Sequence, residues 1–275
     1  MHMKTPKVLI PLAVTVSALA FGTVAGAQVV PVFSEDFDRA DGAVGNGWSF
    51  SSSGNGGGGG GTAPTAVISG NRLTLERKGW GPDATATLTH STDDFNTLTA
   101  NIVIPSLTGG TAGGDSSLSL LAADQDTGAY IRVALVNSNS NGGFAVRLAS
   151  STNGTWPGWT YYFPASGNTT NPGEVSVSIH IGEGGLVSVS IVQTSDDTLV
   201  TSWTGTNTSF VGANFDQIRV LGNWTAWTSP NTSNPLYIDN IQASMVTSNI
   251  PEPSSFACLA GLTALGAVAS RRRKR

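Results

Sequence analysis

The chain has 275 residues, of which 39% are hydrophobic and 12% charged, with 34 glycines and a formal net charge of −4. The charged fraction is about half of the ~25% typical of soluble domains. Glutamate and lysine are scarce, which argues against a helical bundle, because exposed helix faces need such residues. Composition therefore predicts a turn-rich, all-β protein. Residues 28–250 carry seven cationic and 17 acidic side chains, a net charge of −10 that excludes a typical nucleic-acid-binding surface.

Residues 1–27 have the organisation of a secretory signal peptide. Lys4 and Lys7 precede an apolar stretch at residues 8–21, and the small residues 25–27 form a cleavage site. The alternative is a retained membrane anchor, but the apolar stretch is shorter than the ~20 residues that span a bilayer. The segment predicts that the protein is exported.

Period-two alternation of apolar and polar residues recurs along the body, and each run is bounded by Gly, Asn, Asp or Pro. This pattern is typical of short strands with one buried face. Ten to twelve such strands without helical periodicity favour a two-sheet antiparallel sandwich. The runs lie at residues 72–76, 97–104, 116–122, 130–136, 144–149, 175–181, 186–192, 199–203, 217–221 and 236–243.

The clearest pattern is a hairpin formed by residues 175–181 and 186–192 around a glycine-rich turn at residues 182–185. Valine and isoleucine alternate with serine on both predicted strands, so one face is apolar and the other polar. His180 belongs to the polar face, and we expect it at the surface rather than in a catalytic or metal site.

The end of the chain contains three ordered elements. Pro251, Glu252 and Pro253 come first, an uncharged segment follows at residues 256–269, and a basic cluster ends the chain. An apolar segment followed by cations behaves as a stop-transfer element. The segment is short for a stable span, so this predicted hydrophobic helix suits a transient contact with the membrane, with a permanent anchor as the alternative. The basic cluster consists of Arg271, Arg272, Arg273, Lys274 and Arg275.

Residues 250–275 closely resemble the PEP-CTERM sorting signal of Gram-negative bacteria, with Ile250 where that family usually has valine. The resemblance implies recognition by exosortase, a membrane-bound enzyme that resembles cysteine transpeptidases, in bacteria that make exopolysaccharide. It predicts a destination in the cell envelope or extracellular matrix, not an activity. Cys258 lies in this segment and residues 28–250 contain no cysteine, so a sizeable apolar core must stabilise the body.

A second resemblance rests on residues 35–48, 122–130 and 237–241, which look like parts of laminin-G and concanavalin-A-like jelly rolls. In that fold the first and last strands lie side by side in one sheet. The resemblance therefore implies that residues 28–249 form a single jelly-roll domain between the signal peptide and the sorting signal.

Glycoside hydrolases need two carboxylates that flank the scissile bond. The concanavalin-A-like family carries them as Glu-x-Asp-x-x-Glu on one strand, and this chain has no such run. His90 and His180 are the only histidines of the body, which gives little support to a catalytic triad or a histidine-based metal site. We therefore expect a non-catalytic protein with no catalytic residues to assign.

Acidic residues offer oxygen ligands for one structural calcium ion. If the terminal strands pair, Glu35 and Asp36 meet Asp239 across them. The alternative is that aspartate is used here as a turn residue, as expected around Asp124.

Aromatic residues in predicted loops are candidates for stacking on sugar rings, and the alternative is that they cap the core of the sandwich. The candidates are Trp156, Trp159, Tyr161, Trp224 and Trp227. The leading hypothesis is an exported, non-catalytic jelly-roll protein that associates with extracellular polysaccharide and binds glycans. Two alternatives are a glycan hydrolase or lyase with an unfamiliar site, and a purely structural surface protein.

Overall fold

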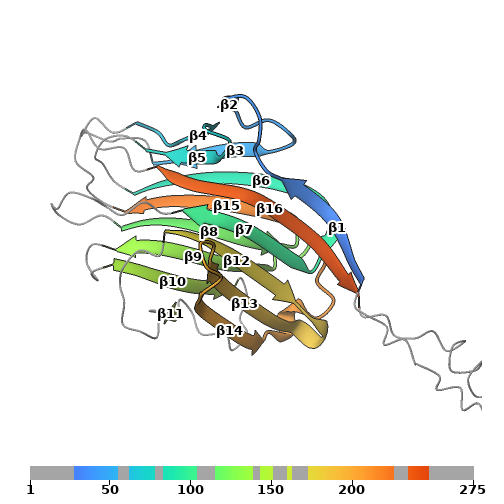
Figure 1. Ribbon diagram of the computed structural model, residues 1–275. Helices are drawn as coiled ribbons and strands as arrows, with labels where there is room; N and C mark the ends of the chain where they lie inside the picture. The colour runs from blue at the N-terminus through green and yellow to red at the C-terminus, as the bar shows by residue number, and fades with distance from the viewer. Residues whose placement is uncertain are drawn as a thin grey trace, which may run out of the picture. The chain divides into compact units, whose positions relative to one another are not determined.

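Two antiparallel β-sheets make up the described part of the computed structural model (Figure 1). The structure describes residues 28–54, 62–77, 83–103, 115–138, 143–150, 160–162, 173–225 and 235–247. All of them belong to one compact unit, Gln28–Thr247. The predicted signal peptide, the predicted C-terminal helix and the sorting residues Pro251, Glu252, Pro253, Arg271, Arg272 and Arg273 lie outside the described residues.

The first sheet, sheet A, has nine strands in the order β14-β13-β12-β7-β16-β5-β4-β2, and β1 pairs with β16. Its strands are β1 (Gln28–Glu35), β2 (Gly42–Ala43), β4 (Thr65–Ile68), β5 (Leu73–Glu76), β7 (Thr97–Val103), β12 (Glu174–Ile181), β13 (Leu186–Gln193), β14 (Leu199–Thr206) and β16 (Leu236–Thr247).

The second sheet, sheet B, has seven strands in the order β11-β10-β9-β8-β15-β6-β3. Its strands are β3 (Ser49–Ser53), β6 (Ala84–Phe95), β8 (Asp115–Ala123), β9 (Tyr130–Ser138), β10 (Gly143–Ser150), β11 (Thr160–Tyr162) and β15 (Phe215–Thr225). Two 3-10 turns, Glu183–Gly185 and Thr208–Phe210, complete the regular structure of the described residues.

One apolar core fills the space between the inner faces of the two sheets. On β12 the inward residues Val175, Val177 and Ile179 are at most 1% exposed, whereas the intervening polar residues are half-buried. The same alternation on β9 buries Ile131 and Val133 in the core. Inward packing therefore fixes which side chains of each strand point to solvent. The predicted all-β, two-sheet sandwich is confirmed.

The predicted hairpin is present as β12 and β13, with Ile181 opposite Val187 across the turn. Outward-facing His180 forms a hydrogen bond of 2.9 Å between its Nδ1 and the Thr97 hydroxyl of the neighbouring strand β7. The prediction that this histidine belongs to the polar face of the hairpin is confirmed.

The first and last strands of the described unit lie side by side, as the jelly-roll resemblance implies (Figure 1). β1 runs antiparallel to β16, with Gln28 opposite Thr247 and Glu35 opposite Ile241. β16 also pairs with β7 and β5, so the last strand lies inside sheet A rather than at its edge. No helix among the described residues is long and apolar enough to cross a membrane.

Asp124 follows β8 and organises the turn into β9. Its carboxylate accepts hydrogen bonds from the backbone N–H groups of Asp126 and Thr127, at 2.9 Å each, and of Asn214, at 3.1 Å. Burial raises the pKa of Asp124, but these hydrogen bonds outweigh burial and hold the pKa below its ordinary value. Aspartate therefore serves here as a turn residue.

We expect Asp124→Ala to lower the free energy of unfolding by about 2 kcal/mol at pH 7, because three backbone N–H groups lose a charged acceptor. A lowered folded-state pKa stabilises the fold above the unfolded carboxyl pKa of about 3.9, and this stabilisation disappears as the pH falls through the folded value. The difference in free energy of unfolding between Asp124→Ala and the wild type, measured by urea unfolding, should therefore be smaller at pH 3 than at pH 7. Asp93→Ala, on an exposed position of β6, is the control. Equal destabilisation by the two variants at pH 7 would contradict this account.

Candidate functional site

Three arginines lie on the outer face of sheet B, which is the face directed away from the core. Arg132, Arg147 and Arg219 come from β9, β10 and β15, and the residues on either side of each are buried. They make up three of the seven cationic side chains of residues 28–250. Three cations therefore share one sheet face of an acidic body.

The strand register brings these arginines close together. Leu121 of β8 is opposite Arg219 on one side and Arg132 on the other. Arg147 is opposite Ala134 of β9, two residues from Arg132 on the same face. Diagonal pairs of this kind on neighbouring strands are within reach of long side chains.

A pocket of about 250 Å³ opens on this outer face where β6 and β8 begin and β15 ends. Two of the three arginines, Arg132 and Arg147, line it, whereas Arg219 does not. The other lining residues that the structure describes are Asp83, Ala84, Thr85, Ser117, Ala134, Val136, Asn223 and Trp224.

One part of the pocket is apolar and another is polar. Ala134 and Val136 form, with Ala145, a small apolar cluster that is separate from the main core. Beside it, the Asn223 side chain accepts a hydrogen bond of 3.1 Å from the Thr85 hydroxyl and donates to the Ser117 hydroxyl at 3.5 Å. The pocket thus presents hydroxyl and amide groups beside an apolar cluster that is almost wholly buried.

Arg132 is held in a defined orientation. Its Nε donates a 2.9 Å hydrogen bond to the Ser119 hydroxyl, which is fully buried on the adjacent strand. Burial lowers the pKa of the Arg132 guanidinium, and the positive charge of Arg147 lowers it further, while Tyr130 has the opposite effect. The guanidinium remains protonated at any working pH, so the pocket contains two positive charges that disfavour each other.

Asp83 is the one carboxylate among the described residues that line the pocket. Its negative charge also raises the pKa of Arg77, opposing the larger lowering effect of burial. A hydrolase of the usual kind needs a second carboxylate on the other side of the bond that breaks.

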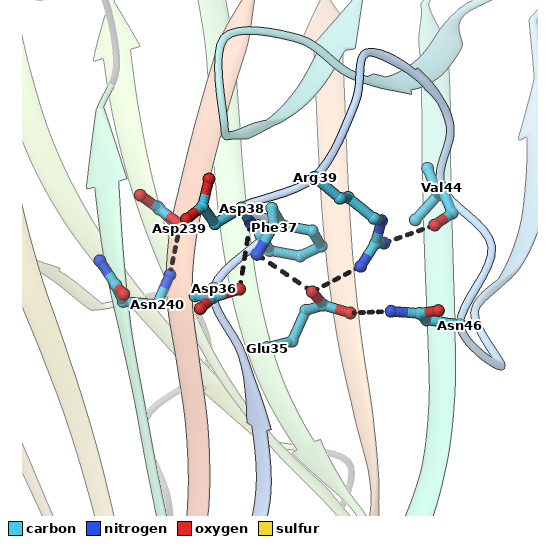
Figure 2. Close-up of polar contacts among 9 residues, drawn as sticks. All are labelled: Glu35, Asp36, Phe37, Asp38, Arg39, Val44, Asn46, Asp239 and Asn240. Atoms are coloured by element: carbon cyan, nitrogen blue, oxygen red, sulfur yellow. Dashed lines mark hydrogen bonds and ion pairs between the residues drawn. The ribbon is translucent and has the colours of Figure 1, made fainter.

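The predicted calcium ligands Glu35, Asp36 and Asp239 are not brought together as a cation site. The Glu35 carboxylate accepts hydrogen bonds from the Phe37 backbone N–H at 3.0 Å, the Arg39 guanidinium at 2.7 Å and the Asn46 amide at 3.3 Å. Figure 2 shows this carboxylate directed toward Arg39 and Asn46, with Asp36 and Asp239 on the other side of Phe37. Among the described residues, no three acidic, histidine or cysteine side chains are arranged to hold a metal ion.

Asp36 and Asp239 instead engage the backbone next to them. Asp36 accepts from the Asp38 N–H at 3.0 Å and Asp239 from the Asn240 N–H at 2.8 Å. Burial is the main cause of a raised pKa at Asp239, and the nearby charge of Asp36 adds to it. The Asp36 bond is that of a turn aspartate, whereas Asp239 lies within β16, where the register with β7 shifts between Asp239 and Gln242.

The aromatic candidates have different outcomes. Trp224 is 2% exposed and belongs to the main core, which fits the core-capping alternative, and it also contributes to the pocket lining. Its ring crosses Gly222, where an added Cβ would lie 2.9 Å from the ring. Tyr161 is opposite Arg147 in the register of β10 and β11. Trp156, Trp159 and Trp227 lie outside the described residues.

The ion pair between Glu35 and Arg39 ties the end of β1 to the residue after β2, because Arg39 also donates to the Val44 carbonyl (Figure 2). We expect Glu35→Gln to lower the free energy of unfolding by about 2 kcal/mol, since it leaves a half-buried guanidinium without its carboxylate. Glu174→Gln is a matched control, because Glu174 pairs with Arg72 at 3.4 Å with both side chains more exposed, and it should cost less than about 1 kcal/mol. Chemical unfolding of both variants measures the difference, and equal costs would contradict this role for Glu35.

Comparison with known proteins identifies a sorting motif in the sequence and a likeness to solved structures in the fold. Residues 249–274 match the PEP-CTERM protein-sorting motif. No curated protein matches the chain in sequence.

Among solved structures, the CBM2 module of the evolved Dit protein of Lactobacillus casei BL23 phage J-1 is similar at a TM-score of 0.54 and 11% identity, covering 80% of this chain and 98% of that one. A pseudo β-1,3-glucanase of Mycobacterium tuberculosis has a TM-score of 0.49 at 12% identity, and the match covers 79% of this chain and 99% of that one. A Bacillus subtilis protein with a galectin-like fold has a TM-score of 0.44 at 11% identity, and the match covers 82% of this chain and 100% of that one. At these identities the likeness concerns the fold alone.

The motif indicates an exported, envelope-sorted protein and implies processing by an exosortase. The chain is thus a two-sheet, jelly-roll-type β-sandwich that carries a PEP-CTERM protein-sorting motif at residues 249–274.

Proposed function

We propose that this protein is a non-catalytic, envelope-sorted polysaccharide-binding protein, and that the pocket on the outer face of sheet B receives a sugar unit. The observation that carries the proposal is the combination, in one pocket, of hydroxyl and amide groups with two cations. The sorting motif supports the location, because an exported protein meets polysaccharide outside the cytoplasm.

The chemistry of the pocket suits a pyranose ring. Such a ring presents C–H groups on its faces and hydroxyls at its edge. The hydroxyls can exchange hydrogen bonds with Ser117 and Asn223, whereas the apolar lining residues Ala134 and Val136 are almost wholly buried and offer the C–H groups little surface. The volume of about 250 Å³ is just below the range of about 300–1,000 Å³ for small-molecule pockets, which fits one ring of a longer chain.

Binding without cleavage is favoured by the charge pattern of the pocket. Retaining and inverting glycosidases both use a pair of carboxylates, and Asp83 is the one acidic residue among the described lining residues. The two arginines of the lining act on bound groups by charge and hydrogen bonding, since a guanidinium does not lose its proton near neutral pH and so cannot serve as a general acid.

The test is to fill the pocket. Ser117 is half-buried on β8 and lines the pocket, so Ser117→Phe places a large ring where the sugar is expected. We expect at least a tenfold loss of affinity for whichever polysaccharide the wild-type protein binds. Affinity electrophoresis through gels containing dextran, alginate or polygalacturonate measures it.

Ser178→Phe is the matched control, because Ser178 is equally half-buried on β12 of the other sheet. This variant should bind as the wild type does, and both variants should be checked by thermal unfolding. Failure of every polysaccharide to retard the wild type, or equal binding by the two variants, would overturn the proposal and favour a purely structural role.

A further inference from the structure

We infer that the Arg132 and Arg147 pair makes the pocket selective for anionic sugars, whose carboxylate or sulfate group lies between the two guanidiniums. This inference rests on the proposed function and narrows it from polysaccharide in general to acidic polysaccharide. Neither the sorting motif nor the fold likeness assigns such a selectivity.

The geometry supplies the first argument. Arg132 and Arg147 project from adjacent strands, β9 and β10, and their positions differ by two residues in the register. The Arg132 Nε bond to the Ser119 hydroxyl orients that guanidinium before any ligand arrives. Planar guanidiniums that are already oriented form bidentate, charge-assisted hydrogen bonds with carboxylate or sulfate oxygens.

Electrostatics supply the second argument. Two cations that share a pocket repel each other, and removing them from water adds a desolvation cost. The lowered pKa of Arg132, caused by burial and by the Arg147 charge, reflects both effects. Among the described lining residues, one carboxylate, Asp83, accompanies the two guanidiniums, so the lining has a net positive charge that attracts an anionic sugar more than a neutral one.

The rest of the body supplies the third argument. Residues 28–250 have a net charge of −10. Three of their seven cations lie on this one sheet face. An acidic polysaccharide is therefore repelled by most of the surface and attracted at the pocket, which orients its approach.

Arg219 is a control for whether binding depends on arginines inside the pocket or on positive charge anywhere on the same sheet face. It lies on the same face as the pair, but it does not line the pocket, and its Nε donates to the Gln217 side chain. A purely general attraction to a positive face would use all three arginines equally. A selective pocket would depend on Arg132 and Arg147 far more than on Arg219.

The experiment compares polysaccharides that differ only in charge. The full chain, purified in mild detergent, is run in affinity gels containing polygalacturonate or its methyl ester, and dextran sulfate or dextran. We expect retardation by at least one anionic member and at least tenfold weaker binding to its neutral counterpart. The double variant Arg132→Gln, Arg147→Gln should lose at least tenfold in affinity for the anionic member, and Arg219→Gln less than about twofold.

Each alternative outcome has a distinct meaning. Preference for polygalacturonate identifies a uronate as the anionic group, and preference for dextran sulfate identifies a sulfate ester. Equal binding of charged and neutral members, unchanged in the double variant, would overturn the inference and leave the proposed function standing. A loss in Arg219→Gln as large as in the double variant would overturn it in favour of general charge attraction. No binding by the wild type would overturn both proposals, provided that thermal unfolding shows all proteins to be folded.

Discussion

The alternation of inward and outward side chains along the strands of sheet B is the constraint on which the candidate site depends. Burial of Ile131, Val133 and Val146 in the core fixes which side chains of β9 and β10 point inward and which point outward. A shift of one residue would expose those groups and bury the arginines, which is far too costly to occur. The same packing that stabilises a body without cysteine thus sets Arg132 and Arg147 on the outer face.

The sequence was informative about this fold where apolar and polar residues alternate strongly, and less so elsewhere. The hairpin of β12 and β13 was predictable because valine and isoleucine alternate with serine. β6 escaped prediction although it has 12 residues, because its inward positions include the small residues Ala84 and Ala86, which weaken the apolar alternation. Pairing of the first and last strands followed from family resemblance, since no local pattern carries information about distant neighbours.

The candidate site was harder to predict than the fold for the same reason. Each arginine stood on a predicted strand, and alternation alone placed it on the polar face. What the sequence could not supply was the order of the strands, in which β15 lies next to β8 and so brings Asn223 opposite Ser117 in the pocket. Aromatic residues were favoured as sugar ligands on general grounds, yet Trp224 packs inside the core. Glu35 was a plausible calcium ligand until its neighbours Arg39 and Asn46 were placed around it.

The central claim is that polysaccharide occupies the pocket on sheet B, and thiol protection tests it most directly. Because residues 28–250 contain no cysteine, a Cys258→Ser background allows one reporter thiol on each sheet face, through Ser117→Cys or Ser178→Cys. The account predicts that the bound polysaccharide slows alkylation severalfold in the Ser117→Cys protein and leaves the Ser178→Cys protein unchanged. Equal rates with and without polysaccharide at position 117, or equal protection of both faces, would contradict it.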